Sequence, residues 1–95
     1  MIVKLVHDND LDLAKDFQSI CNEFTVESEV YDMRYTTDKK KGFKVKGAFS
    51  ARLDPFIGVY DSDNQPIKGF YSEAEECSID NLYNYLNSLK RWKEY

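Results

Sequence analysis

The chain has 95 residues and a net charge of −4, and 42% of its residues are hydrophobic and 15% aromatic. A chain of this length can build one hydrophobic core and has no room for a second independent one. Its four glycines and two prolines are too few for a low-complexity or disordered chain. We therefore expect a single folded domain over residues 1–95.

The apolar runs of the chain are far shorter than the roughly 20 residues needed to cross a bilayer. Residues 1–7 lack the long apolar stretch and cleavage site of a signal peptide, so we expect a cytoplasmic protein without membrane contact. Cys21 and Cys77 are far apart, and a single disulfide or two free thiols would both fit, although a cytoplasmic setting favours free thiols. One histidine and two cysteines do not favour a zinc site, and we expect no metal and no cofactor.

The first third of the chain predicts a strand, a helix and a second strand. Residues 2–7 are β-branched and apolar, and Asp8 or Asp10 can cap a following helix. Apolar residues at spacings of three and four then give residues 11–24 one buried face, formed by Leu13, Phe17, Ile20, Cys21 and Phe24. Residues 25–33 predict a strand, so the unit is βαβ with parallel strands.

Residues 34–54 are the least regular part of the sequence. A cap at residues 36–38 predicts a short second helix that Gly42 would end, followed by an irregular loop. The chain becomes regular again after Pro55, where residues 56–60 and 66–71 predict the two strands of a β-hairpin around the turn 61–65. Pro66 indicates an edge strand. Ser78 can cap a last helix, whose predicted buried face is Ile79, Leu82, Leu86 and Leu89.

This order of elements resembles that of the thioredoxin fold, and three segments are similar to parts of that family. Residues 53–61 (LDPFIGVYD) resemble the family's cis-proline segment, residues 65–70 its next strand, and residues 78–89 its C-terminal helix. The resemblance implies an α/β fold of the form β-α-β-(short α)-β-β-α, with a mixed four-stranded sheet and a cis bond between Asp54 and Pro55. The chain is also similar to small thioredoxin-like proteins of bacterial viruses, for which a virion-associated location would be the alternative to the cytoplasm.

The sequence departs from the family at the redox site. The family's Cys-x-x-C lies where the first strand meets the first helix, but residues 7–12 here read HDNDLD. Carboxylates at this place would raise the pKa of a thiol, whereas the chemistry needs a lowered one. We therefore expect no dithiol redox activity, and no other complete catalytic constellation is evident.

Two residues outside that motif are candidates for chemistry. His7 could act as a general acid or base, but the favoured interpretation is a half-exposed side chain that caps the helix or pairs with an aspartate. Cys77 precedes a helix N-terminus, and residues 77–82 resemble the stretch of glutaredoxins that holds glutathione. A monothiol or glutathione-linked redox protein using Cys77 is therefore the alternative function, although Glu73, Glu75 and Glu76 favour the neutral thiol.

Charge is distributed unevenly along the chain. Residues 34–52 carry seven basic residues and one acidic residue, whereas the rest carries six basic and sixteen acidic residues. A molecule with one positively and one negatively charged region suits docking to a protein partner or to a second copy of itself. We therefore expect a non-catalytic interaction module, such as a structural or accessory component of a larger assembly. The basic segment 39–52, with Phe43 and Phe49, leaves a nucleic-acid-binding accessory protein as a further alternative. The hypothetical binding residues are His7, Asp8, Asp10, Lys40, Lys41, Lys44, Asp54 and Pro55.

Overall fold

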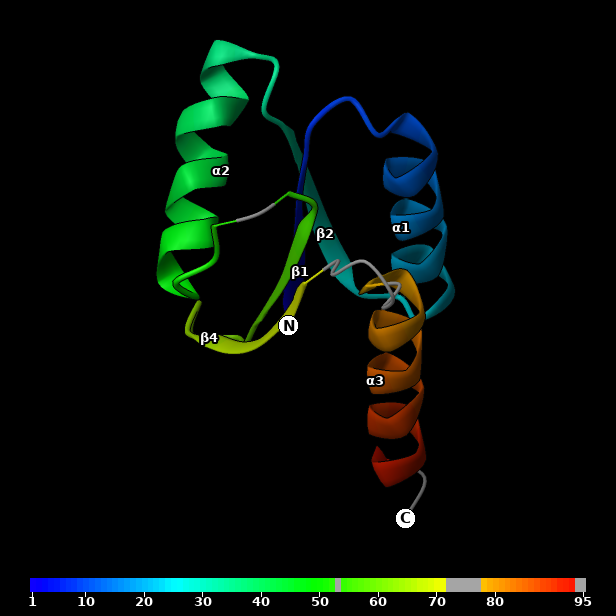
Figure 1. Ribbon diagram of the computed structural model, residues 1–95. Helices are drawn as coiled ribbons and strands as arrows, with labels where there is room; N and C mark the ends of the chain where they lie inside the picture. Colours follow the sequence, from blue (N-terminus) through cyan, green and yellow to red (C-terminus); the bar gives the residue numbers. More distant parts are fainter. Residues whose placement is uncertain (53, 72–77, 94–95) are drawn as a thin grey trace.

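The computed structural model describes residues 1–52, 54–71 and 78–93, and Figure 1 shows how they are arranged. In chain order the elements are β1 (Ile2–His7), α1 (Leu11–Glu23), β2 (Glu27–Asp32), α2 (Thr36–Ala48), β3 (Phe56–Tyr60), β4 (Pro66–Tyr71) and α3 (Ser78–Lys93). The order predicted from the sequence is therefore confirmed.

The strands form one mixed four-stranded sheet in the order β2-β1-β3-β4. β1 pairs in parallel with β2 and antiparallel with β3, and β3 and β4 form the antiparallel hairpin. The hairpin turn is held by the Asp61 carboxylate, which accepts the backbone N–H groups of Asp63 and Gln65. β4 is an edge strand, as Pro66 at its start indicated.

Helices cover both faces of the sheet. In Figure 1, α1 and α3 lie on one side of the strands and α2 lies on the other. Alternate residues of a strand point to opposite faces, and this alternation divides the buried apolar side chains into two clusters. The cluster beneath α1 and α3 contains Val3, Leu5, Phe17, Cys21, Ile57, Val59, Phe70, Leu82 and Leu86. The cluster beneath α2 contains Val6, Val45, Ala51, Phe56 and Tyr60.

α1 begins and packs as its sequence predicts. The Asp10 carboxylate accepts the backbone N–H of Leu13, which is the capping bond expected at a helix N-terminus. Phe17 and Cys21 are buried, and Leu13, Ile20 and Phe24 pack partly buried beside them. The apolar face predicted for this helix is therefore confirmed.

The prediction that Gly42 ends the second helix is wrong. α2 continues through Gly42 to Ala48, and its N-cap is Tyr35, which makes no side-chain capping bond. A side-chain Cβ at Gly42 would lie 2.5 Å from Met33 Sδ and 3.0 Å from Val6 Cγ1. Gly42 therefore lets α2 approach the sheet closely, and it does not stop the helix.

The segment between α2 and β3 carries the predicted cis bond between Asp54 and Pro55. Phe49, just after α2, packs its ring against Phe56 and Tyr60, with centroids 5.2 and 5.5 Å apart. Gly58 leaves the room that this ring needs, because a Cβ there would lie 2.6 Å from Phe49 Cε2. The loop is therefore anchored to the sheet by an aromatic side chain.

Candidate functional site

The candidate site lies at the end of the sheet where β1 and β2 finish and β3 begins. In the sheet register His7 is opposite Asp32 on β2, and the neighbouring Val6 is opposite Phe56 on β3. Pro55 immediately precedes Phe56, so the cis-proline loop lies next to the β1–α1 turn. The structure thus brings together His7, Asp8 and Asp10 with Asp54 and Pro55, which are far apart in the sequence.

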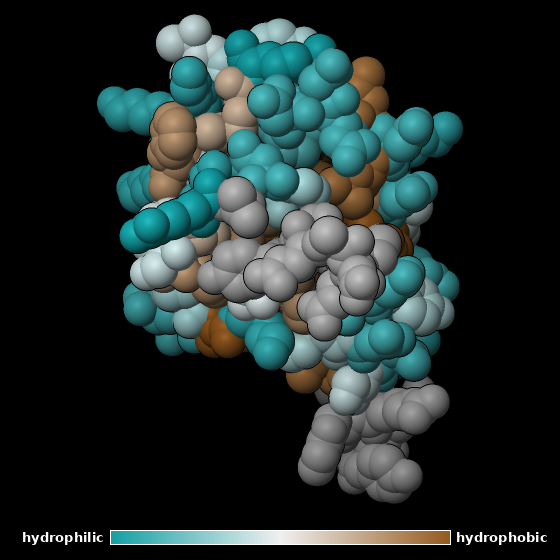
Figure 2. All heavy atoms as spheres, in the orientation of Figure 1, coloured by the Kyte–Doolittle hydropathy of each residue, from teal (hydrophilic) through white to brown (hydrophobic). Residues whose placement is uncertain are grey.

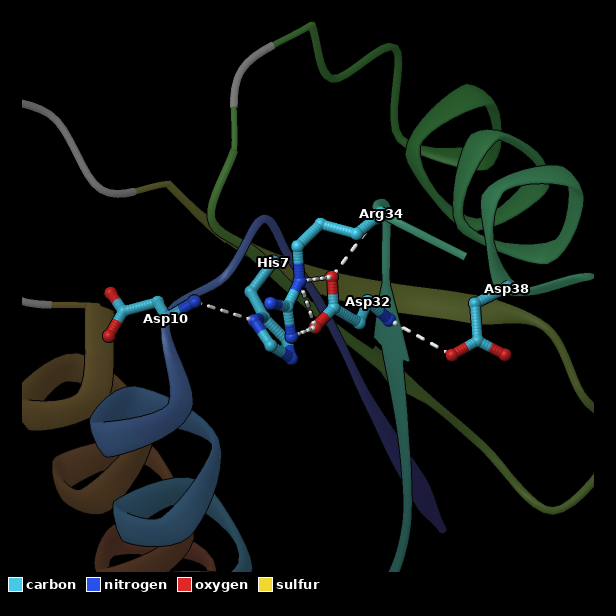
Figure 3. Close-up of polar contacts among 5 residues, drawn as sticks. All are labelled: His7, Asp10, Asp32, Arg34 and Asp38. Carbon is cyan, nitrogen blue, oxygen red and sulfur yellow. Dashed lines mark hydrogen bonds and ion pairs between the residues drawn. The ribbon is translucent and has the colours of Figure 1, made fainter. Parts of the chain in front are cut away.

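His7 is buried, with 2% of its surface exposed, so the expectation of a half-exposed side chain is wrong. Its Nδ1 accepts the backbone N–H of Asp10 at 3.1 Å. Figure 3 shows the Asp10 amide directed toward the imidazole and the Asp10 carboxylate directed away from it. A neutral ring that accepts at Nδ1 carries its proton on Nε2. His7 therefore fixes the turn before α1, while Asp10 caps the helix.

Asp32 and Arg34 form an ion pair with several hydrogen bonds at this end of the sheet. The Arg34 guanidinium folds back over Asp32 and donates from Nε and Nη2, with the shortest bond at 2.6 Å (Figure 3). The Arg34 bonds hold the pKa of the Asp32 carboxyl well below its usual range, and a backbone bond from Asn9 adds to the effect. The same pairing raises the pKa of Arg34, with a smaller contribution from Asp8. The end of β2 is therefore tied to the β1–α1 turn.

The cis-proline loop is tied to α2 by a second ion pair. Lys46 Nζ donates to Asp54 Oδ1 at 2.8 Å, and the Lys46 side chain is only 7% exposed. Such a pair holds its two segments together, because a lysine left without its partner in that environment would be costly. Lys46, which contributes to the charge of the basic segment, therefore acts as a structural tie, while Asp54 itself remains partly exposed.

The other lysines of α2 do not share one face. Residues of a helix advance by 100° each, so Lys41 and Lys44 lie on the flank opposite that of Lys46. Lys41 and Lys44 line a groove between α2 and the sheet, whereas Lys46 faces the cis-proline loop. Lys40 is exposed and does not line this groove. The basic segment is thus split between two sides of one helix.

The two phenylalanines of the basic segment also differ. Phe43 is 54% exposed and lies beneath the Lys46 ammonium, whose distance to the ring centroid is 5.4 Å. Phe49 is half-buried in the aromatic cluster of the sheet, so its ring is not open for a nucleotide base to stack on.

Figure 2 shows the face seen in Figure 1, where hydrophobic side chains emerge only in separate patches among hydrophilic ones.

The cysteines give no redox pair in the part of the chain that the structure describes. Cys21 is a free thiol in the core beneath α1, and burial raises its pKa to about 11. A thiol that is both buried and protonated is a poor nucleophile, in agreement with its interpretation as a core residue. Cys77, the residue on which the alternative redox function depends, lies outside the described residues.

Comparison with solved structures identifies the architecture. Thioredoxin 1 from the thermophilic eubacterium Thermosipho africanus TCF52B superposes with a TM-score of 0.64 over 99% of this chain and 96% of its own. This chain has a thioredoxin-like fold. The sequence identity is 15%, so the likeness extends to the fold alone. No family model and no curated protein matches the sequence.

The thioredoxin-like frame gives the site its context. The turn from β1 to α1, where the resemblance places the family's Cys-x-x-C, is residues 7–10 here and supplies neither a thiol nor a hydroxyl. The cis-proline lies beside it, as the resemblance implied. Within residues 1–52, 54–71 and 78–93, no group of His, Cys, Asp and Glu side chains could hold a metal ion, and no helix is long and apolar enough to cross a membrane.

Sequence reasoning missed the contribution of β2 and the burial of Lys46. Asp32 could have been found, because parallel strands end at the same edge of a sheet, which places the last residue of β2 beside His7. Lys46 had no such signal, since it looks like any other lysine in a run of basic residues. Only the packing of α2 against the loop reveals its role.

Proposed function

We propose that this protein is a non-catalytic thioredoxin-fold interaction module that docks a protein partner at the cis-proline end of its sheet. The observation that carries the proposal is the combination, at one end of the sheet, of a cis-proline loop with a β1–α1 turn that has no cysteine. This arrangement supports recognition of a partner in place of dithiol chemistry.

The polar contacts around this surface support a binding role. The His7–Asp10 bond, the Asp32–Arg34 pair and the Lys46–Asp54 pair each use side-chain groups of the site to fix its backbone. Each of these contacts holds a segment at this end of the sheet in place, which favours the presentation of a fixed surface. A surface that is fixed before binding loses less conformational entropy when a partner docks, which favours affinity.

The exposed groups define the partner surface. Asp8, Asp10 and the partly exposed Asp54 form its acidic part at the cis-proline end of the sheet. Its basic part is formed by the exposed lysines of α2, Lys40, Lys41 and Lys44, of which Lys41 and Lys44 lie on the flank away from the cis-proline loop. Charges of both signs steer and orient a partner more than they add raw affinity. We propose that such a module serves as an accessory component of a larger assembly, of the kind that bacterial viruses encode, within the cytoplasm or on a virion.

The test is to identify a partner by affinity capture and mass spectrometry, and then to measure its binding to purified variants by calorimetry. Asp8→Lys reverses an exposed charge in the β1–α1 turn, and Asp16→Lys makes the same change on the exposed surface of α1. We expect Asp8→Lys to weaken binding by roughly three- to tenfold and Asp16→Lys to leave it unchanged. Equal effects of the two substitutions would contradict docking at this end of the sheet.

A second measurement separates binding from redox function. We expect no dithiothreitol-dependent reduction of insulin by the wild-type protein, because no vicinal dithiol is present. Turnover that disappears in a Cys77→Ser variant would replace the proposal with the monothiol alternative. Reversing Lys40, Lys41 and Lys44 together should also weaken partner binding, most strongly at low salt.

A further inference from the structure

A groove lies on the α2 side of the sheet, toward the other end of β3 from the cis-proline loop. Its volume is roughly 430 Å³, which is in the range of ligand-binding clefts. The residues that line it come from α2, from all four strands and from the hairpin turn: Lys4, Glu29, Tyr31, Lys41, Lys44, Val45, Ala48, Tyr60, Asn64 and Pro66. The groove is therefore built by the tertiary fold and not by one helix.

The charge lining this groove is positive. Lys41 and Lys44 stand one helical turn apart on its wall, and no ion pair involves either of them among the described residues. Lys4 contributes a third ammonium from β1, with its Nζ 4.5 Å from the centroid of the Tyr60 ring. Cations that line one cleft together attract an anionic ligand more strongly than scattered surface lysines do.

The single acidic side chain of the lining is already engaged. The Glu29 carboxylate accepts the hydroxyl of Tyr31 and lies 3.9 Å from Lys4 Nζ. Burial and this bond raise the pKa of the Tyr31 phenol, and burial raises that of Tyr60, so both phenols stay neutral. The charge of Glu29 is thus offset by Lys4, and the two lysines of α2 are the groove's charges without an ion pair among the described residues.

The apolar part of the lining decides which anion fits. Val45, Ala48 and Pro66 add aliphatic surface to the lining that carries the lysines, which suits a peptide with both carboxylates and apolar side chains. Stacked bases fit poorly, because the Tyr60 ring is covered by Lys4 on one side and contacted by Phe49 on another. From this we infer that the groove between α2 and the sheet binds an acidic peptide segment of a partner protein, with its carboxylates on Lys41 and Lys44.

This inference rests on the proposed function, since Lys41 and Lys44 belong to the basic part of the partner surface. It adds the chemistry of the partner and a second place of contact, away from the cis-proline loop. The experiment can therefore be done without the partner, by direct titration of a synthetic peptide. Absence of peptide binding would then contradict the groove, whereas an unchanged affinity of Asp8→Lys for the partner would contradict the cis-proline surface.

The probe is a fluorescein-labelled peptide of sequence Glu-Glu-Leu-Tyr-Glu-Glu, titrated with the full chain and followed by fluorescence anisotropy at 20 and 200 mM salt. We expect saturable binding that weakens at the higher salt. Lys41→Glu with Lys44→Glu should reduce the affinity roughly tenfold or more. The matched control is Lys15→Glu with Lys68→Glu, which changes the net charge equally at exposed lysines outside the groove and should leave the affinity unchanged.

An uncharged variant tests the groove itself. Ala48→Trp places a large side chain on the exposed wall and should reduce peptide binding at constant net charge, while circular dichroism verifies that the variant is folded. Asp8→Lys should leave peptide binding unchanged, which separates this site from the cis-proline surface. The inference is overturned if binding is not saturable, if the control pair weakens binding as much as the groove pair, or if an equally charged single-stranded oligonucleotide binds more tightly than the peptide.

Discussion

Two glycines of α2 offer a matched pair of substitutions that tests how closely this helix approaches the sheet. In Gly42→Ala the new methyl group would lie 2.5 Å from Met33 Sδ and 3.0 Å from Val6 Cγ1. In Gly47→Ala it would meet no atom within 4 Å. Both residues lie within α2, Gly42 in its middle and Gly47 in its last turn, so alanine gains helix propensity at both, up to about 1 kcal/mol.

Because alanine gains propensity at both positions, the difference between the two variants chiefly reports the steric cost at Gly42. Overpacking of a well-packed core by one methyl group costs about 1–3 kcal/mol, since Met33 and Val6 must shift. We therefore expect Gly47→Ala to stabilise the protein by roughly 0.5–1 kcal/mol. Gly42→Ala should be neutral or destabilising by up to about 2 kcal/mol, which is the steric cost less the propensity gain.

The assay is equilibrium urea unfolding of the wild type and both variants, followed by circular dichroism. A difference of about 1–3 kcal/mol separates the two midpoints by roughly 0.5–2 M urea. A Met33→Ala background provides the control, because removing that side chain should recover part of the cost at Gly42 and change nothing at Gly47. Equal stabilisation by both alanines would refute the close approach of α2 to the sheet.

Three further predictions concern the groups that fix the site. Lys46→Met should lower the free energy of unfolding by about 1–3 kcal/mol in urea, because Asp54 loses its partner in a partly buried place. An unchanged unfolding midpoint would contradict a stabilising role for the Lys46–Asp54 ion pair. Because the pKa of Asp32 is lowered, its carboxylate stabilises the fold above pH about 4 and loses this effect as the pH falls through the folded-state pKa. Asp32→Asn should therefore have a lower free energy of unfolding than the wild type at pH 7, and this difference should shrink as the pH falls. A difference that does not change with pH would contradict a stabilising Asp32 carboxylate. In a Cys77→Ser background, Cys21 should resist iodoacetamide at pH 8.5 until the protein unfolds, because burial raises its pKa to about 11, and rapid alkylation of the native protein would count against its burial.

Much of the fold could be predicted because local signals agree with it. The spacing of Leu13, Phe17 and Cys21 gives the buried face of α1, and the turn formers around Asp61 give the hairpin. The resemblance added the cis bond before Pro55, which the structure confirms. In each of these places the residue types and their spacing along the chain are enough to predict the structure.

The site was harder to predict, because its decisive features depend on contacts between distant segments. Gly42 was interpreted as a helix end, but its lack of a side chain serves packing against Met33, which no local pattern shows. His7 was expected to be half-exposed, yet it is buried because β1 lies inside the sheet and extends to this residue. The lysines of α2 look alike in the sequence. Their positions around the helix differ, so Lys46 contacts the cis-proline loop whereas Lys41 lines the groove on the other flank.

The position of β1 has a consequence for how the molecule opens. β1 is hydrogen-bonded to β2 on one side and to β3 on the other, whereas β2 and β4 each have one free edge. Amide protons of an inner strand exchange with solvent only when larger units open, while those of edge strands and turns exchange through smaller fluctuations. Residues 2–6 of β1 are paired on both sides, and His7 directly follows them and pairs with Asp32, so we expect the floor of the site to exchange more slowly than the turn that follows. The strand residues beneath the partner surface are therefore expected to stay paired when the edges of the sheet open.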